Sequence, residues 1–261
     1  MICALGDLLL DVVVRLGGPI APDTDTYGRT RVGAGGQAAN VAAWVAALGG
    51  RARFVGKRAR DPAGRVLVQE LARLGVEVAG PEAEAGTGTV VSIATPDGQR
   101  AMLSDRGVSP DFRPEELEPA WLDGCDWLYV SGYALVRAPL RDTVVAARRL
   151  GSRTCVDLSS AGAIQDVGVE RFRELVARLG PDLVFANKEE DALVGDLGVD
   201  TVVKLGARGC LAGGREHPAA PVEVVDTTGA GDAFAAGYLV GGVETALTAA
   251  ARCVGRMGAQ P

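Results

Sequence analysis

The sequence predicts an α/β fold in which a doubly wound, mostly parallel sheet carries helices on both faces and a small β lid. Apolar runs of strand length alternate with helical patterns along most of the chain, most clearly in residues 125–187. Such alternation is typical of right-handed βαβ units. Residues 88–104 differ, because they alternate like two strands around a turn at Pro96-Asp97-Gly98. This hairpin predicts the lid.

The length of the chain limits the number of domains. Its 261 residues suit one α/β domain with a small appendage, so we expect a single domain over residues 1–261. Hydrophobic residues make up 48 % of the chain, which is enough to fill a large core. We expect two lid segments, approximately 12–32 and 88–104, to be inserted over one edge of the sheet.

Local signals place the elements of the first third. Residues 1–16 predict a strand, a turn and a second strand, and residues 35–50 predict a helix of small residues that ends at two glycines. Asp61 has the position of a helix N-cap, Pro62 fits the first helical turn, and Gly75 ends that helix.

The alternation continues to the end of the chain. Strands are expected at 125–132, 153–159, 181–187 and 200–206, with helices between them and after them. Residues 222–225 (VEVV) are predicted to form a strand that leads into a helix from Gly229 to about Val240, and a last helix follows.

The acidic composition argues against a nucleic-acid-binding protein. The net charge is −6, the sequence pI is about 5.0, and the arginines form no basic run. No apolar run approaches the roughly 18 residues that span a bilayer, and the N-terminus lacks the pattern of a signal peptide. We therefore expect a cytoplasmic protein that binds neither nucleic acid nor membrane.

Cysteine and histidine usage excludes further classes of site. The five cysteines lie far apart and never form C-x-x-C, which fits buried thiols in a reducing compartment. His217 is the only histidine, so a His-rich metal site is excluded. It lies in the loop-like segment 213–221, and we expect it to be a surface loop residue.

A glycine-rich segment, residues 226–234 (DTTGAGDAF), marks a candidate phosphate site. Gly229, Ala230 and Gly231 carry little or no side chain, so their N–H groups can approach a phosphate at the positive end of a helix. Asp232 follows in the first turn, from which a carboxylate can accept the proton of a substrate hydroxyl. A plain glycine turn before a helix-start acid explains the same residues equally well.

A second glycine cluster opens the helix at 35–50, and two interpretations remain open. Gly33-x-Gly35-x-x-Ala38 matches the loose dinucleotide fingerprint of an NAD-type oxidoreductase. The other interpretation is a polyol pocket, in which Gly35 and Gly36 let backbone amides approach and Asn40 donates and accepts. Asp11 could accept two sugar hydroxyl bonds there, or could simply be a charge at a strand edge.

These two segments together resemble the signatures of the ribokinase-like (PfkB-type) sugar kinases. GGQAANVAAWVAALG and DTTGAGDAFAAGY occur in the order which that family shows. Weaker matches are GDLLLDVVV at the start, Asn187-Lys-Glu-Glu190 in the middle and VVKLGARG from Val202. The resemblance covers nearly the whole chain.

The resemblance implies a role for each matching position. Asp232 would be the catalytic base beside an anion hole at Gly229–Gly231. A further set would hold the sugar: Asp11, Gly35, Gly36 and Asn40. Another set would line the site of ATP: Asn187, Lys204, Gly206, Gly209 and Thr228.

The resemblance also implies metals and a partner. Asn187 and Glu190 fall on a motif that organises Mg²⁺ and phosphate in this family, so Glu190 would act on Mg²⁺ indirectly. Asp226 matches a position near a monovalent-cation site, for K⁺, in some members. The lid would cover the sugar, and in relatives it often forms the contact of a homodimer.

The predicted function is transfer of the ATP γ-phosphoryl group to a hydroxyl of a small carbohydrate, such as ribose, fructose or a keto-deoxy sugar acid. Aromatic residues are only 5 % of the chain, which favours a sugar over a nucleoside. Arg106, with Arg29 and Arg31 as further candidates, could grip the carboxylate of a sugar acid. The alternatives are a nucleoside kinase of the same fold, an NAD-type oxidoreductase, and a non-catalytic sugar-binding protein.

Overall fold

Parallel strands form the centre of the molecule in this computed structural model, which describes residues 1–95 and 100–261. Within these residues, nine strands form one sheet in the order β15-β14-β13-β12-β11-β10-β1-β4-β6. Only the edge pairs β13–β14 and β14–β15 are antiparallel. The bounds are β1 (Ile2–Leu5), β4 (Ala52–Val55), β6 (Val76–Ala79), β10 (Trp127–Ser131), β11 (Arg153–Asp157), β12 (Leu183–Asn187), β13 (Thr201–Lys204), β14 (Cys210–Ala212) and β15 (Arg215–His217).

Side-chain alternation along β1 explains why both faces of this sheet are covered. Ile2 and Ala4 belong to one buried apolar cluster, whereas Cys3 and Leu5 belong to another. Successive residues of a strand point to opposite faces, so the two clusters lie on opposite sides of the sheet. The predicted doubly wound architecture is therefore confirmed.

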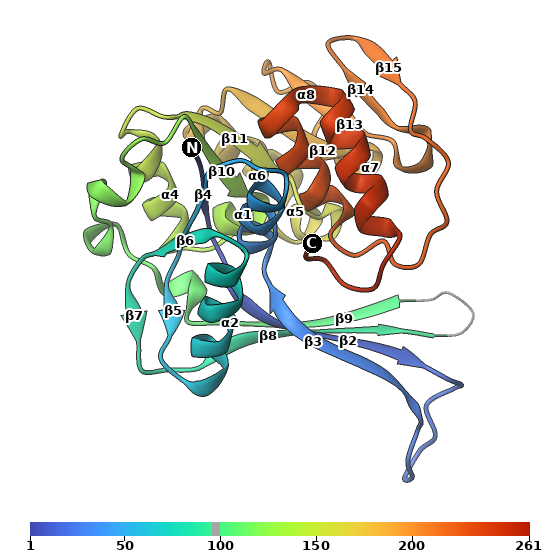
Figure 1. The fold of residues 1–261 in the computed structure, drawn as a ribbon. Helices are drawn as coiled ribbons and strands as arrows, with labels where there is room; N and C mark the ends of the chain where they lie inside the picture. The colour runs from blue at the N-terminus through green and yellow to red at the C-terminus, as the bar shows by residue number, and fades with distance from the viewer. Residues whose placement is uncertain (96–99) are drawn as a thin grey trace.

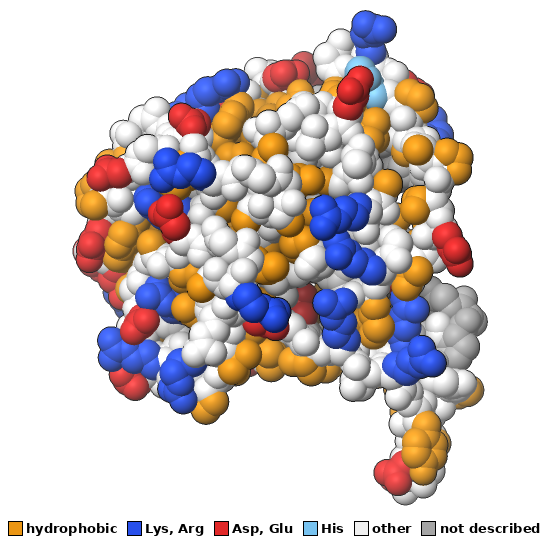
Figure 2. Space-filling model, in the orientation of Figure 1, with side chains coloured by type: hydrophobic (Ala, Val, Ile, Leu, Met, Phe, Trp, Pro, Cys, Tyr) orange, Lys and Arg blue, Asp and Glu red, His pale blue; other side chains and the backbone are white. Residues whose placement is uncertain are grey.

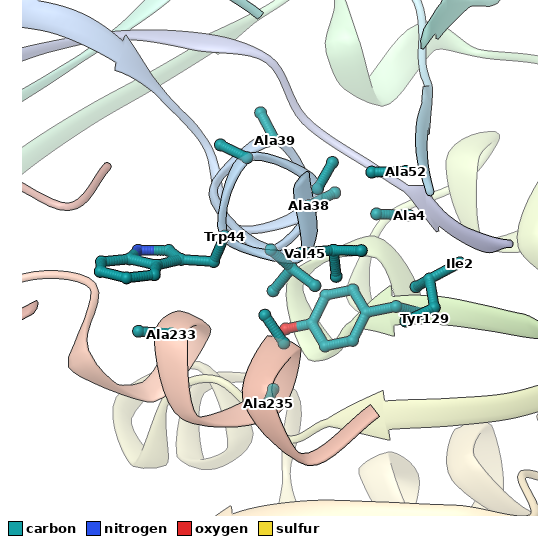
Figure 3. Close-up of a cluster of buried hydrophobic side chains, with 14 of the residues drawn as sticks. Ile2, Ala4, Ala38, Ala39, Trp44, Val45, Ala52, Tyr129, Ala233 and Ala235 are labelled. Atoms are coloured by element: carbon teal, nitrogen blue, oxygen red, sulfur yellow. The ribbon is translucent and has the colours of Figure 1, made fainter. Parts of the chain in front are cut away.

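Helices cover each face (Figure 1). The first cluster is completed by α1 (Gln37–Ala47), α2 (Pro62–Arg73) and α8 (Ala230–Val254). The second is completed by α3 (Gly132–Val136), α4 (Leu140–Arg148), α5 (Ala161–Val167), α6 (Val169–Leu179) and α7 (Lys188–Val194). Tyr129 reaches from β10 toward the space between α1 and α8, where Val45 and Ala235 lie beside it (Figure 3).

Capping explains where α2 begins. The Asp61 carboxylate accepts the N–H of Gly64 at 2.7 Å, and Pro62 occupies the first helical position. An N-cap acid satisfies an amide that has no partner inside the helix. The helix ends before Gly75, whose φ of +86° suits glycine. The predicted limits of this helix are confirmed.

The predicted lid segments form a separate four-stranded sheet with the order β3-β2-β8-β9. It consists of β2 (Leu9–Leu16), β3 (Gly28–Gly35), β8 (Thr87–Ala94) and β9 (Arg100–Gly107), and it extends away from the main body (Figure 1). β2 pairs in parallel with β8 and antiparallel with β3. The turn expected at 96–98 lies outside the described residues. The short strands β5 (Arg58–Ala59) and β7 (Glu82–Ala83) form a separate two-stranded sheet.

Two local predictions were wrong. Residues 222–225 form no strand, and Val224 is 59 % exposed. The N–H of Val225 donates to the carbonyl of Val254 at the end of α8, so it bonds to a helix terminus instead of a sheet neighbour. His217 lies in β15 and not in a loop, because the glycine turn at 213–214 folds a three-residue edge hairpin.

Helix α8 is apolar and, by length and composition alone, long enough to cross a membrane. The 25 residues of α8 are two helices in sequence, because Gly241 and Gly242 have non-helical backbone angles and form a kink between them. The sequence prediction of one helix to about Val240 and a second after it is therefore confirmed.

Candidate active site

The N-terminus of α8 forms the floor of the candidate site. Gly229 precedes the helix with φ +76°, a left-handed conformation that favours glycine, and no side chain caps the helix start. A Cβ on Gly229 would lie 2.6 Å from the Cα of Ala259, so the chain end packs closely behind this turn. The N–H of Ala230 donates to Thr227 at 3.3 Å. The backbone thus presents the positive end of a helix to the adjoining space.

Asp232 is held by a side chain from another helix. Asn40 Nδ2 on α1 donates to Asp232 Oδ2 at 2.8 Å, and both side chains are buried, at 5 % and 9 % exposure. Burial raises the pKa of Asp232 to about 7, the Asn40 hydrogen bond opposes that rise, and the charge of Asp157 adds to it. The rise corresponds to a penalty on the order of 4 kcal/mol for ionising the group. A carboxyl with this pKa can exchange a proton near neutral pH.

Asp11 and two glycines lie beside this pair. A Cβ on Gly35 would fall 2.0 Å from Asp11 Cγ, so only glycine lets the carboxylate pack there. Gly36 has φ +92° and approaches the backbone of Asp7. Asn40 Oδ1 is buried without a hydrogen-bond partner in the described part of the chain. A buried acceptor of this kind is suited to a substrate hydroxyl.

Lys204 and Asp157 form a buried ion pair next to the anion-binding turn. Lys204 Nζ lies 2.6 Å from Asp157 Oδ2 and 3.3 Å from the position of a Cβ on Gly231. Burial by itself lowers the pKa of Lys204, but the charges of Asp157 and Glu190 outweigh it and raise that pKa. The ammonium therefore stays charged beside the turn.

Asp157 is a site residue that the sequence prediction missed. It is fully buried and is the last residue of β11. Its position could have indicated it, because ligands of open α/β sheets bind at the carboxyl ends of the strands. Asn187 and Lys204 end β12 and β13 in the same way, so three neighbouring strands converge on one place.

Asn187 and Glu190 form a capping box at the start of α7. Glu190 accepts from the Asn187 N–H at 2.8 Å and from its side-chain amide at 2.6 Å. Burial, together with the charge of Asp157, raises the pKa of Glu190. In the described part of the chain, no group of three or more His, Cys, Asp or Glu side chains could hold a metal ion. The indirect role of Glu190 toward Mg²⁺ stays a prediction.

The remaining nucleotide-site candidates shape two loops. A Cβ on Gly209 would lie 1.9 Å from the carbonyl oxygen of His217, whereas one on Gly206 would meet open space. Asp226 accepts from the Thr228 hydroxyl at 2.6 Å and from the Gly258 N–H at 3.0 Å. Asp226 therefore ties the loop before α8 to the segment that follows this helix.

Arg106 does not point a free guanidinium at the site. It makes two bonds to the Asp7 carboxylate, at 2.7 and 2.8 Å, and a third to the Tyr133 carbonyl at 3.0 Å. A bidentate pair of this kind is strong and specific in geometry. Binding of a substrate carboxylate would require Arg106 to exchange partners, and that role stays a prediction.

Comparison with known proteins agrees with this geometry. Residues 1–259 match the pfkB family of carbohydrate kinases. The chain belongs to this family. The enzyme is therefore a phosphotransferase that acts on a sugar hydroxyl, in a family that depends on ATP. The dinucleotide interpretation of Gly33 and Gly35 is wrong, because β3 is an antiparallel lid strand and not part of a parallel βαβ unit.

Individual relatives resemble the enzyme over most of their length. An ATP-dependent ribose-1-phosphate kinase from Halopiger xanaduensis is 31 % identical over 285 positions, covering 99 % of this chain and 93 % of the relative. A fructokinase from Klebsiella pneumoniae is 33 % identical, covering 92 % and 83 %. The crystal structure of adenosine kinase from Sinorhizobium meliloti superposes with a TM-score of 0.86 at 26 % identity, covering 100 % and 95 %.

The pKa of Asp232 predicts how activity depends on pH. A base works only as the carboxylate, so protonation below about pH 7 should remove activity. We expect kcat/KM to rise with pH and to reach half its maximum near 7. An aspartate of ordinary pKa would keep the enzyme active to much lower pH. A flat profile through neutrality, with circular dichroism showing a folded protein, would contradict this assignment.

Proposed function

We propose that the enzyme transfers the γ-phosphoryl group of ATP to a hydroxyl of a small sugar, with Asp232 as the base. One observation carries this proposal: a buried carboxyl with a pKa of about 7 lies in the first turn of a glycine-capped helix and is oriented by Asn40. Helix amides suit the phosphate, and the carboxyl suits the hydroxyl proton.

Each group would contribute one part of the reaction. Asp232 accepts the hydroxyl proton, the hydroxyl oxygen bonds to the γ-phosphorus, and the bond to the β-γ bridging oxygen breaks to release ADP. The amides of Gly229, Ala230 and Gly231 would bind the transferring group. Lys204 Nζ, 3.3 Å from the position of a Cβ on Gly231, would add positive charge beside them. Fixed charges of this type stabilise the negative charge that spreads over the phosphoryl oxygens.

We further propose that Mg²⁺ and K⁺ support the reaction. Mg²⁺ bound with ATP would shield the phosphate charge, and Glu190 would orient its water ligands. Both Asp226 carboxylate oxygens accept backbone N–H bonds, so that residue would hold its loop near a K⁺ site. The nucleotide itself would lie along two loops, one that contains Gly206 and Gly209 and one that contains Thr228.

The proposed acceptor is a sugar and not a nucleoside. Ribose-1-phosphate, fructose and adenosine are the substrates named for the three relatives above. A nucleoside base needs aromatic faces for stacking. The β2–β3 connection offers only Tyr27, which is 84 % exposed. A non-catalytic sugar-binding role is disfavoured by the intact pair of Asn40 and Asp232.

Replacement of the base tests the proposal. We expect Asp232→Asn to lower kcat by roughly 10²–10⁴-fold, because a general base contributes that much, while sugar binding changes little. A coupled assay of ADP release over ribose, fructose, keto-deoxy sugar acids and adenosine measures this. Asp166→Asn, on the exposed face of α5, is the matched control and should keep full activity. Full turnover in Asp232→Asn would rule out Asp232 as the base.

We also propose that the lid forms a homodimer. Cross-strand pairing aligns Val32, Val12, Val91 and Leu103 across the four strands on the face opposite to Asp11. Val32 and Leu103 are 58 % and 59 % exposed. An apolar row of this kind on a sheet is typical of a protein contact.

A charge in this row tests the dimer. We expect Leu103→Lys to sediment as a monomer, because two buried lysines would face each other across a symmetric interface. Sedimentation velocity measures the mass, with Leu150→Lys as control at an exposed position just after α4. A native chain that is monomeric at high concentration would contradict the proposal.

A further inference from the structure

The lid presents a row of arginines on the same face as Asp11. Asp11 pairs with Gly33, and the next pairs along the two strands are Val13 with Arg31 and Arg15 with Arg29. Alternate residues of paired strands share one face of a sheet, so these arginines lie on the Asp11 side. Arg31 donates to the Met257 carbonyl and Arg15 to the Val225 carbonyl. This face therefore turns toward the segments that flank α8.

Arg256, just after α8, lies near enough to Arg31 for the two charges to interact. Its guanidinium lies 5.1 Å from the centre of the Trp44 ring. Its Nε and Nη2 atoms are buried, and neither has a hydrogen-bond partner among the residues that the structure describes. Burial, with the like charges of Arg252 and Arg31, lowers the pKa of Arg256. An arginine remains charged even so, and like charges without an anion repel each other.

A cavity beside this arginine cluster contains both Arg31 and Asp11 in its lining. Asp11, Arg31, Glu70, Arg73 and Ala259 line it. Glu70 Oε2 accepts the Ala34 N–H at 2.8 Å, and the Asp11 carboxylate is turned against Gly35. Figure 2 shows blue side chains gathered on this face between α8 and the lid strands. Positive charge thus collects here on a protein of net charge −6.

We propose that Arg31 and Arg256 form a subsite for the anionic group of a phosphorylated or carboxylated sugar, whose acceptor hydroxyl lies at Asp232. This inference rests on the proposed function. Asn40 contacts Asp232, and Trp44, under Arg256, lies one helical turn or roughly 6 Å further along α1. Asp11 and Arg31 line one cavity, so a sugar held by Asp11 can place its anionic group beside Arg31. Arg106 is bonded to the Asp7 carboxylate, so Arg31 and Arg256 are the arginines that we expect to bind the anion.

Matched neutral and anionic sugars test the subsite in the ADP-release assay. The panel is ribose with ribose 1-phosphate, and fructose with 2-keto-3-deoxygluconate, so that phosphate and carboxylate are distinguished. We expect an anionic sugar to give the highest kcat/KM. Arg31→Met and Arg256→Met should each raise its KM by about tenfold or more, as loss of a charged hydrogen bond does, and leave neutral sugars nearly unchanged. Arg149→Met, exposed at the end of α4, is the control.

The outcomes separate this inference from the proposed function. Preference for a neutral sugar, or an equal rise in KM for both classes in Arg31→Met, would overturn the subsite while the kinase proposal stands. No turnover with any sugar would overturn the proposed function instead. Calorimetric binding of ribose 1-phosphate and of 2-keto-3-deoxygluconate would then decide the subsite: loss in Arg31→Met supports it, and absence of binding to the native protein overturns it. Because Arg31 is exposed, its replacement leaves the core intact even if Arg256→Met unfolds.

Discussion

The hydrogen bond between Asn40 and Asp232 is the contact on which the site depends. It joins α1 and α8, which come from opposite ends of the chain and pack on the same face of the sheet. Ala233 of α8 is a small residue that lies beneath the Trp44 ring of α1, which lets the two helices approach closely (Figure 3). This close packing fixes the carboxyl at the start of α8.

The balance of buried charge gives the site its chemistry. Asp157, Glu190 and Asp232 are all nearly inaccessible to water, and Lys204 is the ammonium among them. Lys204 pairs directly with Asp157, and the negative charge of Asp157 offsets the effect of the ammonium on Asp232. The pKa of Asp232 therefore stays high. A positively charged turn and a carboxyl group with a raised pKa thus lie side by side. This arrangement suits a base that accepts the proton of a hydroxyl next to a bound phosphate.

Sequence patterns predicted the parts that depend on local chemistry. The glycine-rich helix starts and the cap formed by Asp61 and Pro62 were visible because neighbouring residues determine them. Pairs that are distant in sequence were not visible. Nothing near Lys204 indicates that it meets Asp157, and nothing near Arg106 indicates that Asp7 engages it. The wrong strand at 222–225 has the same cause, since its apolar pattern is strand-like but no sheet neighbour is within reach.

Titration of the Asp232 carboxyl carbon by NMR tests the central claim without knowledge of the sugar. The native protein should titrate near 7, because burial outweighs the hydrogen bond from Asn40. In Asn40→Ala the midpoint should move higher, since that bond stabilises the ionised form. A midpoint in the ordinary aspartate range, unchanged in Asn40→Ala, would contradict a buried base held across the two helices.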